Sequence, residues 1–121
     1  MHNTLLLIFL GGGLGSLARF GVSLAVRQFP ATAFPLATLL ANVLACAVMG
    51  FVLWQFAARP ADAPMRMFLI TGFCGGFSTF STFSLETLEL FRRGQAVLGV
   101  LNVTLSLALC IAVLAVLVRK T

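Results

Sequence analysis

Phenylalanine rings and small hydroxyl side chains share one short stretch of the sequence, GFCGGFSTFSTFS at residues 72–84. Phe77, Phe80 and Phe83 recur every three residues, with serine or threonine between them. Because an α-helix turns every ~3.6 residues, this spacing predicts a slightly coiled ladder of rings with hydroxyl groups beside it. Ring edges and hydroxyl donors can both approach an anion. The alternative is a stripe of rings that packs against neighbouring helices or lipid.

Three glycines, Gly72, Gly75 and Gly76, precede the three rings of this ladder. Glycine weakens a helix interior, so a break in the helix is possible at this point. A break would release main-chain carbonyl groups, which in transporters often bind a monovalent cation at membrane depth. A continuous helix with a close-packed glycine face is the alternative interpretation.

Asn42 is the one strongly polar side chain in the middle of the second apolar segment. An amide there is costly unless it is hydrogen-bonded. Its N–H donors suit an anion that must shed water, and Thr38 lies one turn earlier on the same face. Asn102 and Ser106 could extend a polar face in the fourth segment. For Asn42, the alternative is an interhelical hydrogen bond that holds the helices together.

Charged side chains are few inside the apolar segments. Arg19 lies well toward the far end of the first segment, where it could raise the local concentration of anions at a pore mouth or anchor in lipid headgroups. Glu86 and Glu89 could pair with Arg92 or Arg93 at the end of the third segment. Alternatively, Glu86 could border the row of hydroxyl groups.

The composition is typical of an integral membrane protein. Of the 121 residues, 60% are hydrophobic and 9% are charged, and the mean hydropathy is +1.09. The formal net charge of +5 comes from scattered basic residues, which favours loops at a membrane surface over nucleic-acid binding. Cys46, Cys74 and Cys110 match no metal-binding spacing, and we expect them to be inert small hydrophobes.

The sequence predicts an all-α integral membrane protein with four transmembrane helices in a single domain of residues 1–121. A bilayer core about 30 Å thick requires roughly 20 apolar residues in a helix. Four stretches reach this length, at residues 4–26, 34–58, 67–90 and 95–118.

Basic residues in the loops nearly balance across the membrane. The face shared by both termini carries Arg59, Arg66, Arg119 and Lys120, and the other face carries Arg27, Arg92 and Arg93. With so little bias the chain could insert both ways and pair as an antiparallel, dual-topology homodimer. Dominance of one orientation is the alternative. Four tightly packed helices leave no pore along their own axis, so we expect any transport route at a boundary between chains.

Two glycine pairs have the GxxxG spacing that permits close helix packing. They are Gly11 and Gly15 in the first span, and Gly72 and Gly76 in the third. For Gly11 and Gly15 we expect packing within one chain.

Three segments together resemble the small bacterial fluoride channels of the Fluc or CrcB type: GFCGGFSTFSTFS in the third span, GGGLGSLARF in the first and ATLLANVLACAVMG in the second. The likeness extends over essentially the whole chain. It implies a passive fluoride-selective channel, not an enzyme, that exports cytoplasmic fluoride across the inner (plasma) membrane and so lowers fluoride toxicity. It also implies two pores in an antiparallel dual-topology homodimer.

The resemblance assigns roles to individual residues. Phe80 and Phe83 would present their ring edges to fluoride, Asn42 would be the pore-lining amide, and Arg19 would stand in the vestibule. The polar track beside the rings would contain Ser81, Thr82, Glu86 and Ser106, and Thr38 shares a helix face with Asn42.

In channels of this family the third helix breaks near the two-fold axis, and main-chain carbonyls of both chains hold a sodium ion. Carried onto this sequence, the carbonyls belong to Gly75 and Ser78. Ser78 stands where the family usually has threonine, which matters little for a carbonyl ligand. Ala37 stands where glycine is common, which could alter packing near Asn42.

Two other functions fit the outline of the chain. A small four-helix multidrug or cation–proton exporter needs a membrane-embedded carboxylate early in the first span, and that span contains no acidic residue. A non-transporting membrane subunit would use the same polar side chains only to hold its helices together.

Overall fold

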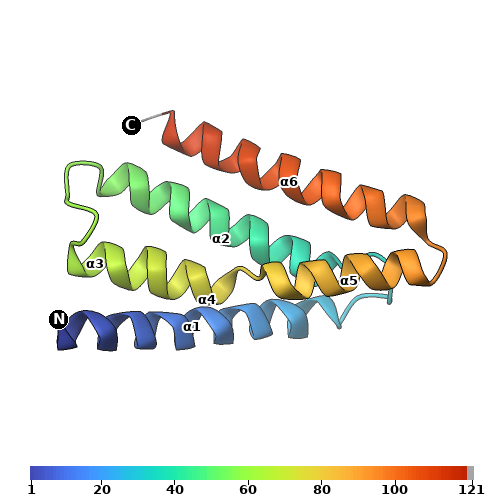
Figure 1. The fold of residues 1–121 in the computed structure, drawn as a ribbon, viewed down its shortest axis with the longest axis horizontal. Coiled ribbons are helices and arrows are strands. Elements are labelled where there is room, and N and C mark those ends of the chain that lie inside the picture. Colours follow the sequence, from blue (N-terminus) through green and yellow to red (C-terminus); the bar gives the residue numbers. More distant parts are fainter. Residues whose placement is uncertain (120–121) are drawn as a thin grey trace.

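The computed structural model describes residues 1–119, so that Lys120, counted above among the loop charges, and Thr121 lie outside the described part. Within the described residues, four helical spans are long and apolar enough to cross a membrane: His2–Val26, Leu36–Gln55, Pro64–Arg92 and Ala96–Val118. Successive spans run in opposite directions, and the start of the first span and the end of the fourth lie at the same end of the bundle (Figure 1). The predicted all-α fold with four spans is confirmed.

The third span is built differently from the other three. α1 (His2–Val26), α2 (Leu36–Gln55) and α6 (Ala96–Val118) are each a single α-helix. The third span consists of α3 (Pro64–Arg66), the π-helix η1 (Met67–Cys74), α4 (Gly75–Phe77) and α5 (Phe80–Arg92). It is also the least hydrophobic span, with a mean hydropathy of 1.3 against 2.6 for α6.

Two extended residues separate α4 from α5. Ser78 has φ −74° and ψ 157°, and Thr79 has φ −151° and ψ 115°. The preceding Gly75 is helical, with φ −63° and ψ −36°, so the residues that leave the helix are the hydroxyl residues and not the glycines. Serine and threonine side chains offer the backbone alternative hydrogen bonds. Here Thr79 caps α5, because its hydroxyl accepts a hydrogen bond from the N–H of Thr82 at 3.3 Å.

The predicted ladder of three rings is wrong. Phe77 is only 6% exposed and packs edge-on against Phe73, with ring centroids 5.5 Å apart. Phe80 is 78% exposed and pairs with Phe83 at 5.7 Å. The extended residues reset the rotation of α5 relative to α4, so that the rings before and after them no longer share one face.

Glycines allow α1 to lie directly against η1 and α4. A Cβ atom on Gly15 would overlap the carbonyl of Phe73, and one on Gly76 would overlap the carbonyl of Gly12. The Cβ of a residue replacing Gly72 would stand 3.0 Å from the Cα of Gly11. The two GxxxG pairs therefore face each other within one chain, as expected for the pair in α1.

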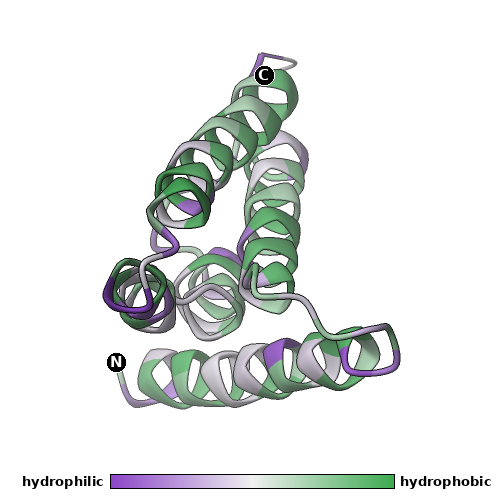
Figure 2. Ribbon diagram, turned by 90° about the vertical axis from the view of Figure 1, so that its right-hand side faces the viewer, coloured by the Kyte–Doolittle hydropathy of each residue, from purple (hydrophilic) through white to green (hydrophobic). Residues whose placement is uncertain are grey.

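The buried core is small and lies where α2 meets the third span. Ala41 and Ala45 of α2 are at most 2% exposed and pack against Phe77, with Ala18 and Val22 of α1 beside them. Hydrophobic residues extend along all four spans (Figure 2). Most apolar surface thus remains available to lipid or to another chain.

Replacing Gly15 by alanine should destabilise the protein by about 1–3 kcal/mol, because the new methyl group must displace backbone atoms of the third span. Gly13 is the matched control, since it lies in the same helix and has nothing within 4 Å of its Cβ position. Thermal unfolding in detergent should show a lower midpoint for Gly15→Ala and an unchanged or higher midpoint for Gly13→Ala. Equal midpoints for the two variants would contradict the observed helix packing.

Candidate functional site

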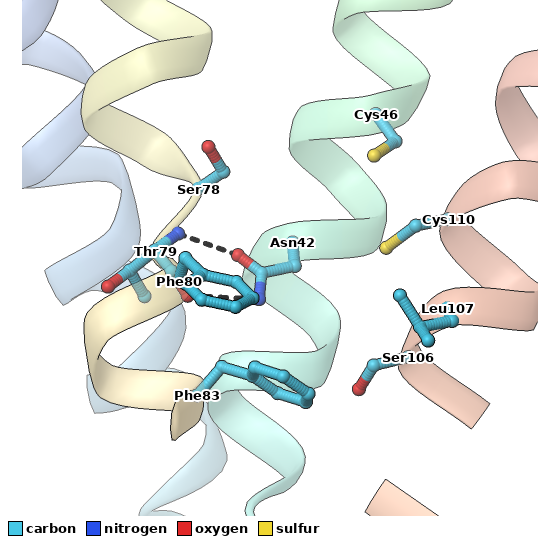
Figure 3. A pocket seen from close by; sticks show the side chains of 9 residues that line it. All are labelled: Asn42, Cys46, Ser78, Thr79, Phe80, Phe83, Ser106, Leu107 and Cys110. Carbon is cyan, nitrogen blue, oxygen red and sulfur yellow. Dashed lines mark hydrogen bonds between the residues drawn. The ribbon is translucent and has the colours of Figure 1, made fainter. Parts of the chain in front are cut away.

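The side-chain amide of Asn42 pairs with the backbone of Thr79. Its Oδ1 atom accepts a hydrogen bond from the Thr79 N–H at 2.7 Å, and its Nδ2 atom donates to the Thr79 carbonyl at 3.3 Å (Figure 3). Backbone groups outside a helix are costly in an apolar medium unless they find such partners. Asn42 therefore makes the interhelical hydrogen bonds that were its alternative role, and it retains a second Nδ2 hydrogen.

The same interactions divert two amides from their usual helical partners. In an uninterrupted α-helix the N–H of Thr79 would donate to Gly75, and that of Thr82 would donate to Ser78. Thr79 donates instead to Asn42, and Thr82 donates to the Thr79 hydroxyl. The carbonyls deprived of these amides are the pair that the resemblance assigns to sodium.

One cavity of about 220 Å³ brings together four of the predicted pore residues. We call it the phenylalanine cavity; it is lined by Asn42, Cys46, Ser78, Thr79, Phe80, Phe83, Ser106, Leu107 and Cys110. The lining comes from α2, from α5 with the extended residues before it, and from α6 (Figure 3). One site thus combines residues from three helices that are far apart in the sequence: Asn42, the pair Phe80 and Phe83, and Ser106.

A second cavity, of about 310 Å³, brings together four more of the predicted site residues: Arg19, Thr38, Thr82 and Glu86. We call it the arginine cavity; it is lined by Ser16, Arg19, Phe20, Ser23, Ala37, Thr38, Thr79, Thr82 and Glu86. Thr79 lines both cavities. Thr38 and Glu86 are joined across it, because the Thr38 hydroxyl donates to Glu86 Oε1 at 2.9 Å.

Glu86 and Glu89 point in different directions. Glu89 lies 3.8 Å from Arg93 in an exposed ion pair one helical turn apart, which confirms one of the predicted pairings. Glu86 contacts Thr38 of α2, and its buried Oε2 atom has no hydrogen-bond partner within the described chain. Of its two predicted roles, bordering the polar residues agrees with its position.

Asn102 does not line either cavity. It is 1% exposed, and its Nδ2 atom donates to the Thr87 hydroxyl at 2.9 Å. Thr87 donates in turn to the carbonyl of Phe83 at 2.7 Å, and Ser106 donates to Asn102 Oδ1 at 3.4 Å. Asn102 and Ser106 are therefore hydrogen-bonded to each other on one polar face of α6. Asn102 fixes α6 to α5, and only Ser106 lines the phenylalanine cavity.

Two predicted site residues lie outside both cavities. Ser81 is exposed, with its hydroxyl 3.3 Å from that of Thr79. Gly75 is exposed, and apart from its own helix no described residue lies within 4 Å of its Cβ position. Both residues therefore face away from the enclosed part of the site.

Sequence reasoning gave no separate role to Thr79, Cys46 or Cys110. Thr79 could have been singled out, because threonine is one of the residues preferred just before the first turn of a helix. No local pattern marked Cys46 and Cys110, whose position depends on how α2 and α6 pack.

Comparison with known proteins gives a consistent result over the whole chain. The family described as CrcB-like protein, Camphor Resistance (CrcB), matches residues 6–118. A fluoride-specific ion channel FluC from Rhizobium leguminosarum bv. trifolii is 46% identical over 116 residues, covering 92% of this chain and 93% of the relative. FluC proteins from Ruminiclostridium cellulolyticum and Pyrococcus abyssi are 42% and 46% identical, over 84% and 83% of this chain and 78% and 80% of their own lengths.

Replacing Asn42 by alanine should remove both hydrogen bonds to the backbone of Thr79 and make the surrounding segment more mobile. With both Thr79 groups unpaired, amide hydrogen exchange in residues 78–82 should become about tenfold faster or more. Leu44→Ala is the control, since Leu44 lies in the same helix and is 46% exposed. Mass-spectrometric exchange that is equally slow in both variants would show that Asn42 does not hold this segment.

Proposed function

Because this chain belongs to the CrcB-like protein family, we propose that it is a passive, fluoride-selective ion channel that carries fluoride out of the cell across the plasma membrane. It is a multi-pass membrane protein with four spans. The observation that carries the proposal is the meeting of Asn42, Phe80 and Phe83 at one cavity in a chain of this family. Export of fluoride would lower its toxicity.

The phenylalanine cavity has the groups that a small, strongly hydrated anion requires. Fluoride gives up water only where close donors replace it. The second Nδ2 hydrogen of Asn42 and the ring edges of Phe80 and Phe83 are such groups. Chloride is larger, and a passage matched to fluoride excludes it.

The arginine cavity would be the vestibule of this route. Arg19 supplies a positive charge that raises the local concentration of anions. Thr38, Thr82 and Glu86 line the same cavity, which continues to Thr79 and thus to the wall of the phenylalanine cavity. Fluoride would pass from the one to the other along this row of polar groups, with Ser106 at its side.

An antiparallel dual-topology homodimer would complete the pore. Phe80 is 78% exposed although it lies in a membrane span, so its ring can enclose an ion only if a second surface covers it. In an antiparallel dimer, each copy would supply the covering surface for the Phe80 ring of the other copy. The dimer would therefore contain two pores. The nearly balanced loop charges support this arrangement, as does the open approach to Gly75, where a partner backbone could come close.

A sodium ion would fit between the two copies. Hard cations prefer oxygen ligands, and unwound carbonyls at membrane depth are a common source of them. The carbonyls of Gly75 and Ser78 are suited to this role because their usual amide partners, in Thr79 and Thr82, are bonded elsewhere. The ion would supply positive charge and link the two chains, with each chain contributing the same pair of carbonyls.

Liposomes containing the protein should release fluoride much faster than chloride. Phe80→Ile should lower the fluoride efflux rate by about tenfold or more, because it removes the ring edge from the passage. Ion-selective electrodes measure both halides.

Phe9→Ile is the matched control, since Phe9 is 76% exposed in another span and lines neither cavity. Its fluoride efflux should stay within about twofold of the unchanged protein. Equal efflux of both halides would rule out selectivity. If the unchanged protein releases no fluoride, and Asn42→Ala still destabilises the fold, the protein is better explained as a non-transporting membrane subunit.

Sodium should stabilise the folded protein, because an ion that binds only the folded dimer shifts the unfolding equilibrium. The midpoint of thermal unfolding should rise as sodium replaces N-methylglucamine at constant ionic strength. Ser78→Ala should keep this dependence, since the proposed ligand is the carbonyl and not the hydroxyl. A midpoint independent of sodium would contradict the proposed site.

A further inference from the structure

Two cysteines from different helices meet at the phenylalanine cavity. Cys46 lies in α2 one turn beyond Asn42, and Cys110 lies in α6 one turn beyond Ser106. Both thiols are free and both residues line this cavity. Figure 3 shows both sulfur atoms directed into the same space beside Asn42 and Leu107.

The third cysteine has a different environment. Cys74 belongs to η1, is 0% exposed and lines neither cavity. The expectation that all three cysteines are inert small hydrophobes therefore suits Cys74. It does not suit Cys46 and Cys110, which are only half-buried and line a cavity from opposite helices.

We propose that Cys46 and Cys110 form a two-thiol binding site for a soft, thiophilic metal cation, and that a cation bound there obstructs the phenylalanine cavity. Soft cations prefer sulfur ligands, whereas Na⁺ and other hard cations prefer oxygen. Two thiolates from facing helices suit an ion such as Hg²⁺ that accepts two ligands. On binding, both S–H bonds break, two S–Hg bonds form and two protons pass to the solvent, with no change of oxidation state.

Obstruction follows from the position of the site. Cys46 and Cys110 share the cavity with Asn42, Phe83 and Ser106, so a metal ion held between the thiols occupies space beside these groups. Its two bonds also join α2 to α6, which are packed side by side. The effect on fluoride flux rests on the proposed channel function, whereas the binding of the metal does not.

Binding can be measured without any flux. The purified protein is treated with mercuric chloride and washed with a monothiol, which removes mercury held by a single sulfur, and retained metal is counted by mass spectrometry. We expect one mercury ion per chain in the unchanged protein and in Cys74→Ser, and none in Cys46→Ser or Cys110→Ser. Retention by either of the last two variants, or none by the unchanged protein, would overturn the two-thiol site.

Fluoride efflux from liposomes tests the obstruction. Mercuric chloride should slow efflux by about tenfold or more in the unchanged protein and in Cys74→Ser, and a dithiol should restore it. Each variant is compared with its own untreated sample, and Cys46→Ser and Cys110→Ser should respond by less than about twofold. If mercury is retained but fluoride efflux does not change, the site does not lie on the fluoride route. If mercury is retained by a protein that conducts no fluoride even without mercury, the proposed channel function is wrong and the two-thiol site stands.

Discussion

The pairing between the Asn42 amide and the Thr79 backbone is the interaction on which the rest of the structure depends. Leaving a helix inside a membrane exposes an N–H and a C=O that lipid cannot satisfy, at a cost of several kcal/mol. A side chain from α2 satisfies both groups at once. The third span can therefore change its course at Ser78 and Thr79, and α5 can present Phe80 and Phe83 to a cavity.

The third span packs closely against α1 on one side, and the two cavities lie elsewhere along it. Glycines let α1 contact η1 and α4 through backbone atoms, so that half of the third span is held tightly. Beyond Thr79, α5 is fixed to α6 by a buried network through Asn102 and Thr87 and to α2 through Thr38. Thr79 lines both cavities, and the Thr38–Glu86 hydrogen bond belongs to the lining of the arginine cavity.

Polar side chains of the third span lie where they can form hydrogen bonds with each other or with the backbone. The hydroxyls of the third span bond to backbone carbonyls, to a helix start or to a second polar side chain, as expected where water is scarce. Phe80 remains largely uncovered within the single chain. In the dimer that we propose, a second chain would cover Phe80, and the cavity that Cys46 and Cys110 also line would become part of an enclosed passage.

The sequence by itself determined the four spans, because hydropathy and length are local properties. It also indicated glycine packing in α1 and, through the family resemblance, the residues that meet at the site. Only the tertiary structure decided that the helix of the third span is interrupted at Ser78 and Thr79 and that Phe77 is buried. It also decided that Glu86 contacts α2 and that Cys46 faces α6. Each of these depends on how one helix is rotated and positioned against another, and the order of residues along a single helix does not fix that rotation.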